Sequence, residues 1–229
     1  MDLIHTILLW IHIPFGSLSL ILFWIPVGVK KGSALHKKVG WYYFICMWIV
    51  LVSAALLSIS NTILGNYTAA IFLGYLTVIT SFPLWYSYDI LRQKKEWSDR
   101  YFLTRKIFLG LICIAGLVLL YIGAVKFKFQ NMGIVILFFG VLGMLSIKQL
   151  LLTKERAILI ETKLKMHIQG TIITGIAAYT AFFAFGARRF FIDTLQLDGQ
   201  WMILPWILPT ILGVGYMRYM KGKYTKAEK

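Results

Sequence analysis

Residues 3–29 read LIHTILLWIHIPFGSLSLILFWIPVGV, a run of 27 residues without a single Asp, Glu, Lys or Arg. A helix of that length rises 1.5 Å per residue and can cross the roughly 30 Å hydrocarbon core of a bilayer. The whole chain is similarly apolar, because 59% of its 229 residues are hydrophobic and only 14% are charged. Soluble domains carry about 25% charged residues. The sequence therefore predicts an integral membrane protein and excludes an ordinary soluble domain.

Six more apolar segments follow the first one, and short connections join them. Each segment is long enough to cross the bilayer as a helix. The seven predicted helices span residues 3–29, 39–60, 68–91, 107–125, 132–151, 166–185 and 201–220. We therefore expect one all-α transmembrane domain over residues 1–229, built as a bundle of seven helices.

The positive charges lie in alternate connections. The first, third and fifth connections and the C-terminal end hold 20 of the 24 Lys and Arg residues, and only Lys126, Lys128, Arg188 and Arg189 lie on the opposite side. By the positive-inside rule, the N-terminus faces outward and the C-terminus is cytoplasmic. This topology explains the net charge of +15 without nucleic acid as a partner. It also favours contact with the bilayer's anionic headgroups.

Ionisable side chains are costly inside a bilayer, so they are the default functional candidates there. His12 lies roughly 15 Å along the first helix, near the midplane, and small residues share its face. His36 begins the second helix from the cytoplasmic side, with Ser33 as the predicted N-cap. His167 begins the sixth helix from that side, and Asp89 ends the third helix there. By depth, His36, His167 and Asp89 are level with one another.

Three kinds of chemistry fit these groups. Imidazoles on facing helices can supply both axial ligands of haem b, which predicts a cofactor site of His36 and His167, with His12 as the next candidate. Alternatively, His36, His167 and Asp89 bind zinc with a position left open for water, as in an intramembrane hydrolase. In the third interpretation the protein is a small-molecule carrier or an assembly factor. Each histidine can also serve only an interhelical hydrogen bond.

We favour the first hypothesis, in which haem b or a related redox cofactor serves electron transfer. The sequence has no Cys-x-x-Cys-His motif, which excludes a covalently attached c-type haem. Because no soluble domain is predicted, the expected electron partners are a membrane quinone or a redox partner protein.

Several short motifs carry a resemblance to a known group of proteins. In chain order they are His12-Ile-Pro-Phe-Gly16, Lys31-Gly32, His36-Lys-Lys-Val-Gly40-Trp-Tyr42, His167 with Ala177-Ala-Tyr-Thr-Ala-Phe182, and Trp206-Ile-Leu-Pro-Thr210. Together they resemble an uncharacterised family of bacterial multi-pass membrane proteins that is known only as a domain of unknown function. The resemblance covers most of the chain and implies the bacterial inner membrane, without implying an activity.

Overall fold

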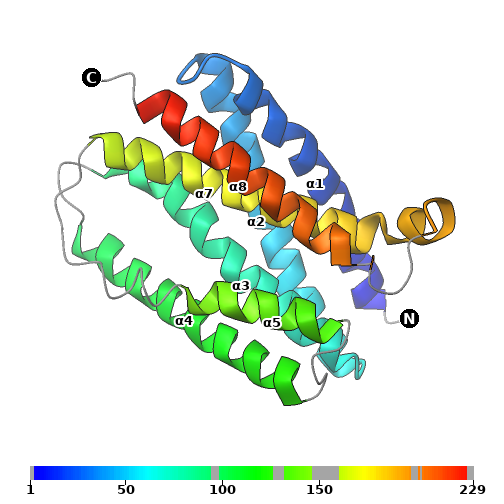
Figure 1. Cartoon of the computed structure of the whole chain (residues 1–229). Coiled ribbons are helices and arrows are strands. Elements are labelled where there is room, and N and C mark those ends of the chain that lie inside the picture. The colour runs from blue at the N-terminus through cyan, green and yellow to red at the C-terminus, as the bar shows by residue number, and fades with distance from the viewer. Residues whose placement is uncertain are drawn as a thin grey trace. The chain divides into compact units, whose positions relative to one another are not determined.

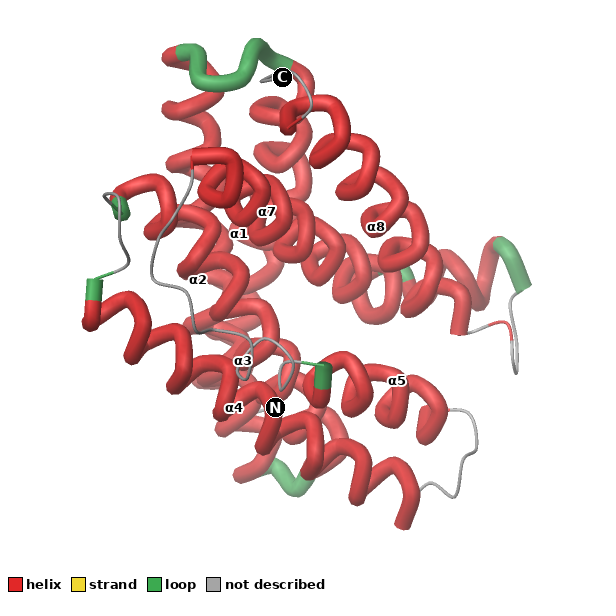
Figure 2. Tube along the Cα trace, turned by 60° about the vertical axis from the view of Figure 1, so that its left-hand side comes forward, coloured by secondary structure: helices red, strands yellow, loops and turns green. Residues whose placement is uncertain are grey.

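A computed structural model describes residues 3–93, 98–125, 132–145, 160–196, 201 and 203–225. All regular elements in these ranges are helical, and none is a β-strand (Figures 1 and 2). The long helices are α1 (Leu3–Gly28), α2 (Ala34–Ile63), α3 (Tyr67–Asp89), α4 (Asp99–Val125), α5 (Met132–Met144), α7 (Ile160–Ala181) and α8 (Leu204–Thr225). The short segments are the 3-10 turn η1 (Ile90–Arg92) and the π-helical η2 (Phe182–Gly186) and η3 (Phe190–Thr194). The predicted all-α class is confirmed for the described part of the chain.

Several helix boundaries differ from the predicted ones. Ser33 caps α2 as expected, because its side chain accepts a hydrogen bond from the His36 amide, so α2 begins at Ala34 rather than at residue 39. The prediction that the fourth helix starts at residue 107 is wrong, because α4 begins at Asp99. Ser98 caps this helix with its hydroxyl, which accepts a hydrogen bond from the Tyr101 amide at 3.2 Å. The charged first turns of α4 are therefore helical rather than part of a connection.

The last helices differ in a similar way. Within the described residues, helix α7 already includes Ile160, six residues before the predicted start, and α8 extends to Thr225, past the predicted end at residue 220. The predicted end of the fifth helix, at residue 151, lies outside the described residues.

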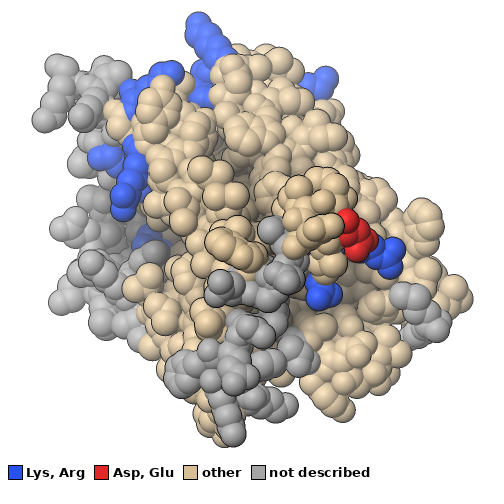
Figure 3. Space-filling view, turned by 45° about the vertical axis from the view of Figure 1, so that its right-hand side comes forward, with Lys and Arg blue, Asp and Glu red and all other residues tan. Residues whose placement is uncertain are grey.

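Five helices in the described ranges are long and apolar enough to cross a membrane. They span Leu3–Gly28, Ala34–Ile63, Ala69–Arg92, Asp99–Val125 and Lys163–Gly186. Their outer surfaces are apolar as well, since Trp10 is 76% exposed and Ile114 is 61% exposed. Among the described residues in Figure 3, Lys and Arg gather at the top and left of the view and beside one acidic group at the right, and most of the remaining surface is uncharged. Large exposed apolar areas of this kind are suited to lipid contact, so the fold is that of a helical membrane protein.

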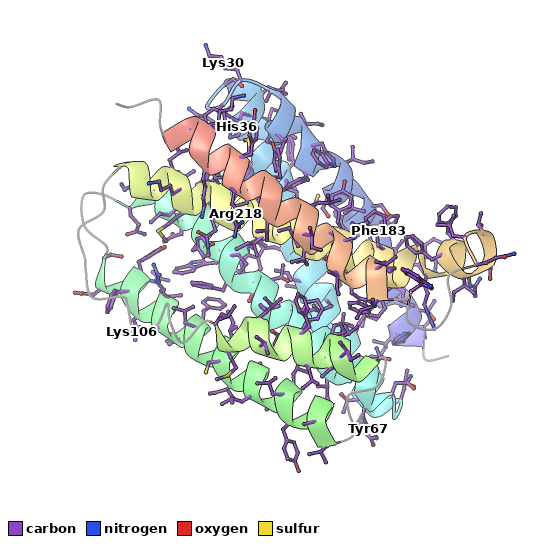
Figure 4. All side chains as sticks on the ribbon, viewed as in Figure 1. Lys30, His36, Tyr67, Lys106, Phe183 and Arg218 are labelled. Atoms are coloured by element: carbon purple, nitrogen blue, oxygen red, sulfur yellow. The ribbon has the colours of Figure 1, made fainter. Side chains whose placement is uncertain are left out.

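The chain divides into two compact units, Met1–Leu84 and Trp85–Lys229, and α3 begins in the first and ends in the second. In unit 1, α1 and α2 pack against each other as a helical hairpin. The turn between them includes Gly32, whose φ of 75° is a conformation that glycine adopts easily. Helix α3 joins α2 through Ser58, whose hydroxyl donates to the Ala70 carbonyl at 2.6 Å. Figure 4 shows Lys30 and His36 near the α1–α2 turn and Tyr67 at the start of α3.

Unit 2 contains two more helix pairs, α4–α5 and α7–α8. Glycine allows α4 and α5 to approach closely, because a Cβ atom on Gly116 would lie 2.9 Å from the Gly140 carbonyl oxygen. Helices α7 and α8 enclose a small core of Ile168, Ile172 and Met220. Small residues at helix contacts are typical of membrane proteins, where packing rather than the hydrophobic effect drives association.

Candidate functional site

Two histidines on α1 contact two serines on α2 at matching intervals. His5 Nδ1 lies 3.0 Å from Ser60 Oγ, and His12 Nδ1 lies 2.9 Å from Ser53 Oγ. The histidines are seven residues apart, and so are the serines, which matches the two helices over two turns. Both serines are buried. The two His–Ser contacts are therefore consistent with one register of the α1–α2 hairpin.

The proton on the His12 ring can be assigned from its neighbours. The Ser53 hydroxyl donates its one proton to the Val50 carbonyl at 3.0 Å. Ser53 Oγ must therefore accept from His12, so the His12 proton is on Nδ1. In the neutral imidazole this leaves the lone pair on Nε2, the nitrogen that can bind a metal.

His36 contacts the end of α1 through its ring. Its Nδ1 lies 3.1 Å from the Pro26 carbonyl oxygen. A carbonyl only accepts hydrogen bonds, so Nδ1 is the donor here too. In the neutral ring, Nε2 then carries the lone pair. The same carbonyl accepts from Lys31 Nζ at 2.7 Å, and Lys31 also donates to the Val27 carbonyl at 2.6 Å. Together His36 and Lys31 donate hydrogen bonds to carbonyls that the last turn of a helix leaves without partners.

His167 occupies a comparable position in unit 2. Its Nδ1 lies 2.7 Å from the Ser87 carbonyl oxygen, so the ring again donates from Nδ1 to the main chain. Two residues later, the Asp89 carboxylate accepts from Gln93 Nε2 at 2.7 Å. Lys163 Nζ donates to the Gln93 carbonyl. The His167 and Lys163 bonds dock the end of α3 and the residue after η1 against the first turns of α7.

The predicted site residues are thus distributed over both units. His12 and His36 belong to unit 1, whereas His167 and Asp89 belong to unit 2. Within unit 1, the His36 partner Pro26 lies 14 residues beyond His12 on α1, which is roughly 21 Å along a helix. His12 and His36 therefore cannot bind one metal ion together. The pairing of His36 with His167 stays a prediction.

The metal-binding alternative can be compared with the described part of the chain. Over those residues, no group of three or more His, Cys, Asp or Glu side chains is placed to hold a metal ion. Asp89, the carboxylate of the predicted zinc set, accepts a hydrogen bond from Gln93, and its role as a zinc ligand stays a prediction.

An arginine that the sequence placed in a connection is found inside a helix. Arg105 lies in the second turn of α4, its Nε atom is buried, and its charge acts on the hydroxyls of Tyr86 and Tyr101. The Tyr101 ring stacks on Trp85 with ring centroids 4.9 Å apart, and Trp85 also stacks on Phe108 at 5.7 Å. The spacing of four between Tyr101 and Arg105, which puts both on one helix face, is the signal that could have revealed this cluster.

A shallow groove lies beside the His12–Ser53 contact. It has a volume of about 300 Å³ and lies between α1 and α2, with Leu8, Ile11, Trp48 and Ser53 among its lining residues. Its surface is almost entirely apolar. The groove therefore has the chemistry of a lipid-facing surface rather than that of a site for a polar substrate.

No protein-family model, curated protein or solved structure matches this chain.

Proposed function

We propose that this protein is a seven-helix protein of the bacterial inner membrane that binds haem b or a related redox cofactor through intramembrane histidines and transfers electrons. The candidate ligands are His36 and His167, followed by His12. In this proposal the protein belongs to the uncharacterised multi-pass family that its motifs resemble. Its electron partner is a membrane quinone or a redox protein.

The observation that carries the proposal is the hydrogen bonding of the imidazole rings. His36 and His167 both point Nδ1 at a main-chain carbonyl, at 3.1 Å and 2.7 Å. Histidines that bind metals usually donate their other ring N–H in this way, which fixes the tautomer and makes the ligating nitrogen more basic. The chemistry of these residues therefore fits histidines that would hold a haem iron.

Bound haem supplies a one-electron redox couple. The residues of this chain would bind and orient it. The Pro26 and Ser87 carbonyls would hold the two rings, and the apolar helices would exclude water. Ser53 would hold His12 in the same tautomer.

The proposed topology, with the N-terminus outside and the C-terminus cytoplasmic, is supported by charges within each unit. In unit 1, four lysines lie at the α1–α2 turn: Lys30, Lys31, Lys37 and Lys38. Residues 3–8 and 61–67, at the other end of this hairpin, contain no Lys or Arg. In unit 2, Arg92 stacks over Tyr88 at 4.4 Å, and Lys106 over Phe102 at 4.4 Å. Cations beside aromatic rings are typical of the cytoplasmic membrane interface.

The test is an absorption spectrum of the full chain, purified in detergent from cells supplied with a haem precursor. We expect a Soret band in the oxidised protein and sharper bands after reduction with dithionite. Replacing a proposed ligand, in His36→Ala or His167→Ala, should remove most of the Soret absorbance. Metal analysis of the same sample would detect zinc, the ion of the hydrolase alternative.

His5→Ala is the matched control. His5 also makes an interhelical contact through Nδ1, but with a serine hydroxyl near the end of the hairpin. This variant should keep the wild-type spectrum. A colourless wild-type protein from haem-replete cells would refute the proposal, and full haem content in His167→Ala would remove that residue from the ligand set.

A further inference from the structure

The chain continues in helical turns past the end of the membrane span that contains α7. That span, Lys163–Gly186, has 24 residues, which rise roughly 36 Å along a helix. This length already exceeds the roughly 30 Å hydrocarbon core of a bilayer. Residues 187–195 follow directly and include η3, a separate helical turn beyond the end of α7 (Figure 1). This post-α7 segment therefore lies at the level of the lipid headgroups.

The post-α7 segment is folded back against the end of the span. At Ala187 the backbone, with φ of −93° and ψ of 7°, leaves the helical conformation. The Phe191 ring on η3 then lies 6.0 Å from the Phe183 ring on η2, measured between ring centroids. Residues eight apart are about 12 Å apart along the axis of a straight helix. The chain therefore bends at Ala187, which turns η3 away from the axis of α7 and toward the membrane plane.

The post-α7 segment exposes large apolar side chains. Phe190 is 52% exposed, Leu195 is 50% exposed and Ile192 is 41% exposed. Exposed aromatic and aliphatic side chains beside arginines are typical of segments that lie in the membrane interface. There the apolar groups enter the boundary between headgroups and acyl chains, to a depth of roughly 5–10 Å.

Two adjacent arginines give this segment a positive charge. Arg188 and Arg189 are exposed. Asp193 is the one acidic residue among residues 187–195, so the formal net charge is +1. A guanidinium group can bind phosphate oxygens through two parallel N–H bonds. In the proposed topology this is the outer surface, where Lys and Arg are rare, so the positive-inside rule does not account for these arginines.

We propose that residues 187–195 bind an anionic phospholipid at the membrane surface. Phe190, Ile192 and Leu195 lie among its acyl chains, and the two arginines contact the headgroup phosphate. A lipid rather than a second protein is favoured because the segment continues a membrane-spanning helix and combines exposed apolar side chains with positive charge. The site involves none of the histidines and does not depend on the haem proposal.

The test places the photoreactive residue p-benzoylphenylalanine at position 190 of the full chain, in vesicles of equal amounts of phosphatidylglycerol and phosphatidylcholine. After illumination, mass spectrometry identifies what is attached there. We expect phosphatidylglycerol adducts to exceed phosphatidylcholine adducts about fivefold, the preference that one net positive charge near an anionic membrane gives. Adding Arg188→Gln or Arg189→Gln should bring this ratio close to one, whereas Arg189→Lys should preserve it.

The same probe at Ile114 is the matched control. Ile114 is 61% exposed in the middle of α4, so the probe there should react with both lipids in nearly equal amounts. Equal phosphatidylglycerol enrichment at positions 190 and 114 would overturn the arginine contacts in favour of a diffuse surface charge. A lipid adduct at position 114 but none at 190 would place the segment in water. Cross-linking of two chains through position 190 would make a second copy its occupant.

Discussion

The α1–α2 hairpin and the α4–α5 pair are both held together inside apolar surroundings, but by different means. In α1–α2, histidines on one helix contact serines on the other at 2.9 Å and 3.0 Å. In α4–α5, the helices approach until a Cβ atom on Gly116 would lie 2.9 Å from one main-chain oxygen and 3.1 Å from the Gly143 Cα.

The difference shows two solutions to one problem. Lipid tails are as apolar as Leu side chains, so the hydrophobic effect does not drive membrane helices together. The α4–α5 pair gains dispersion energy from backbones in contact, and its stability depends on shape. The α1–α2 pair gains polar contacts, which also specify which residues face each other.

The largest effect is expected where backbone atoms leave no room. In Gly116→Ala the new methyl group meets the Gly140 carbonyl and the α5 backbone, which cannot rotate away. Overpacking of this kind costs about 1–3 kcal/mol, measured as the free energy of unfolding in mixed detergent and SDS micelles. Gly110→Ala, on the same helix with nothing within 4 Å of its Cβ position, is the control. Equal stability of the two variants would show that the close approach of backbones does not stabilise the α4–α5 pair.

A smaller effect is expected at the polar contact between His12 and Ser53. A double-mutant cycle of His12→Ala and Ser53→Ala should give a coupling free energy of about 0.6 kcal/mol, and no more than about 1.7 kcal/mol, as for other interhelical hydrogen bonds in membranes. The measurement is the same unfolding experiment on the two single variants and the double variant. Strictly additive effects would show that the contact contributes nothing to the pairing of α1 with α2.

The smallest effect is expected for the equivalent cycle on His5→Ala and Ser60→Ala. This contact lies near the start of α1 and the end of α2, where water competes for both polar groups. Its coupling should fall below that of His12 with Ser53 in the same assay. A larger coupling at His5 would mean that the end of the hairpin is as well shielded as its middle.

The presence of the helices could be predicted from the sequence, because the length of an apolar segment does not depend on the rest of the fold. The sequence pattern misplaced the start of α4 because charged residues such as Arg100 and Arg105 resembled a connection, whereas Ser98 allows the helix to begin eight residues earlier. The His–Ser contacts were detectable in principle, since both pairs repeat after seven residues. The partners of His36 and His167 were not, because they are main-chain carbonyls, which every residue carries.

The five-residue turn at 29–33 excludes other alignments of α1 with α2. Because histidines and serines repeat at the same interval, sliding one helix by seven residues would still leave one good contact, such as His12 with Ser60. Such a slip would need the first turns of α2 to unwind or α1 to lengthen, and it would separate His36 from Pro26. The length of the turn thus selects one alignment of the two helices during assembly. A turn longer by about seven residues, which is about two helical turns, would allow this hairpin more than one register.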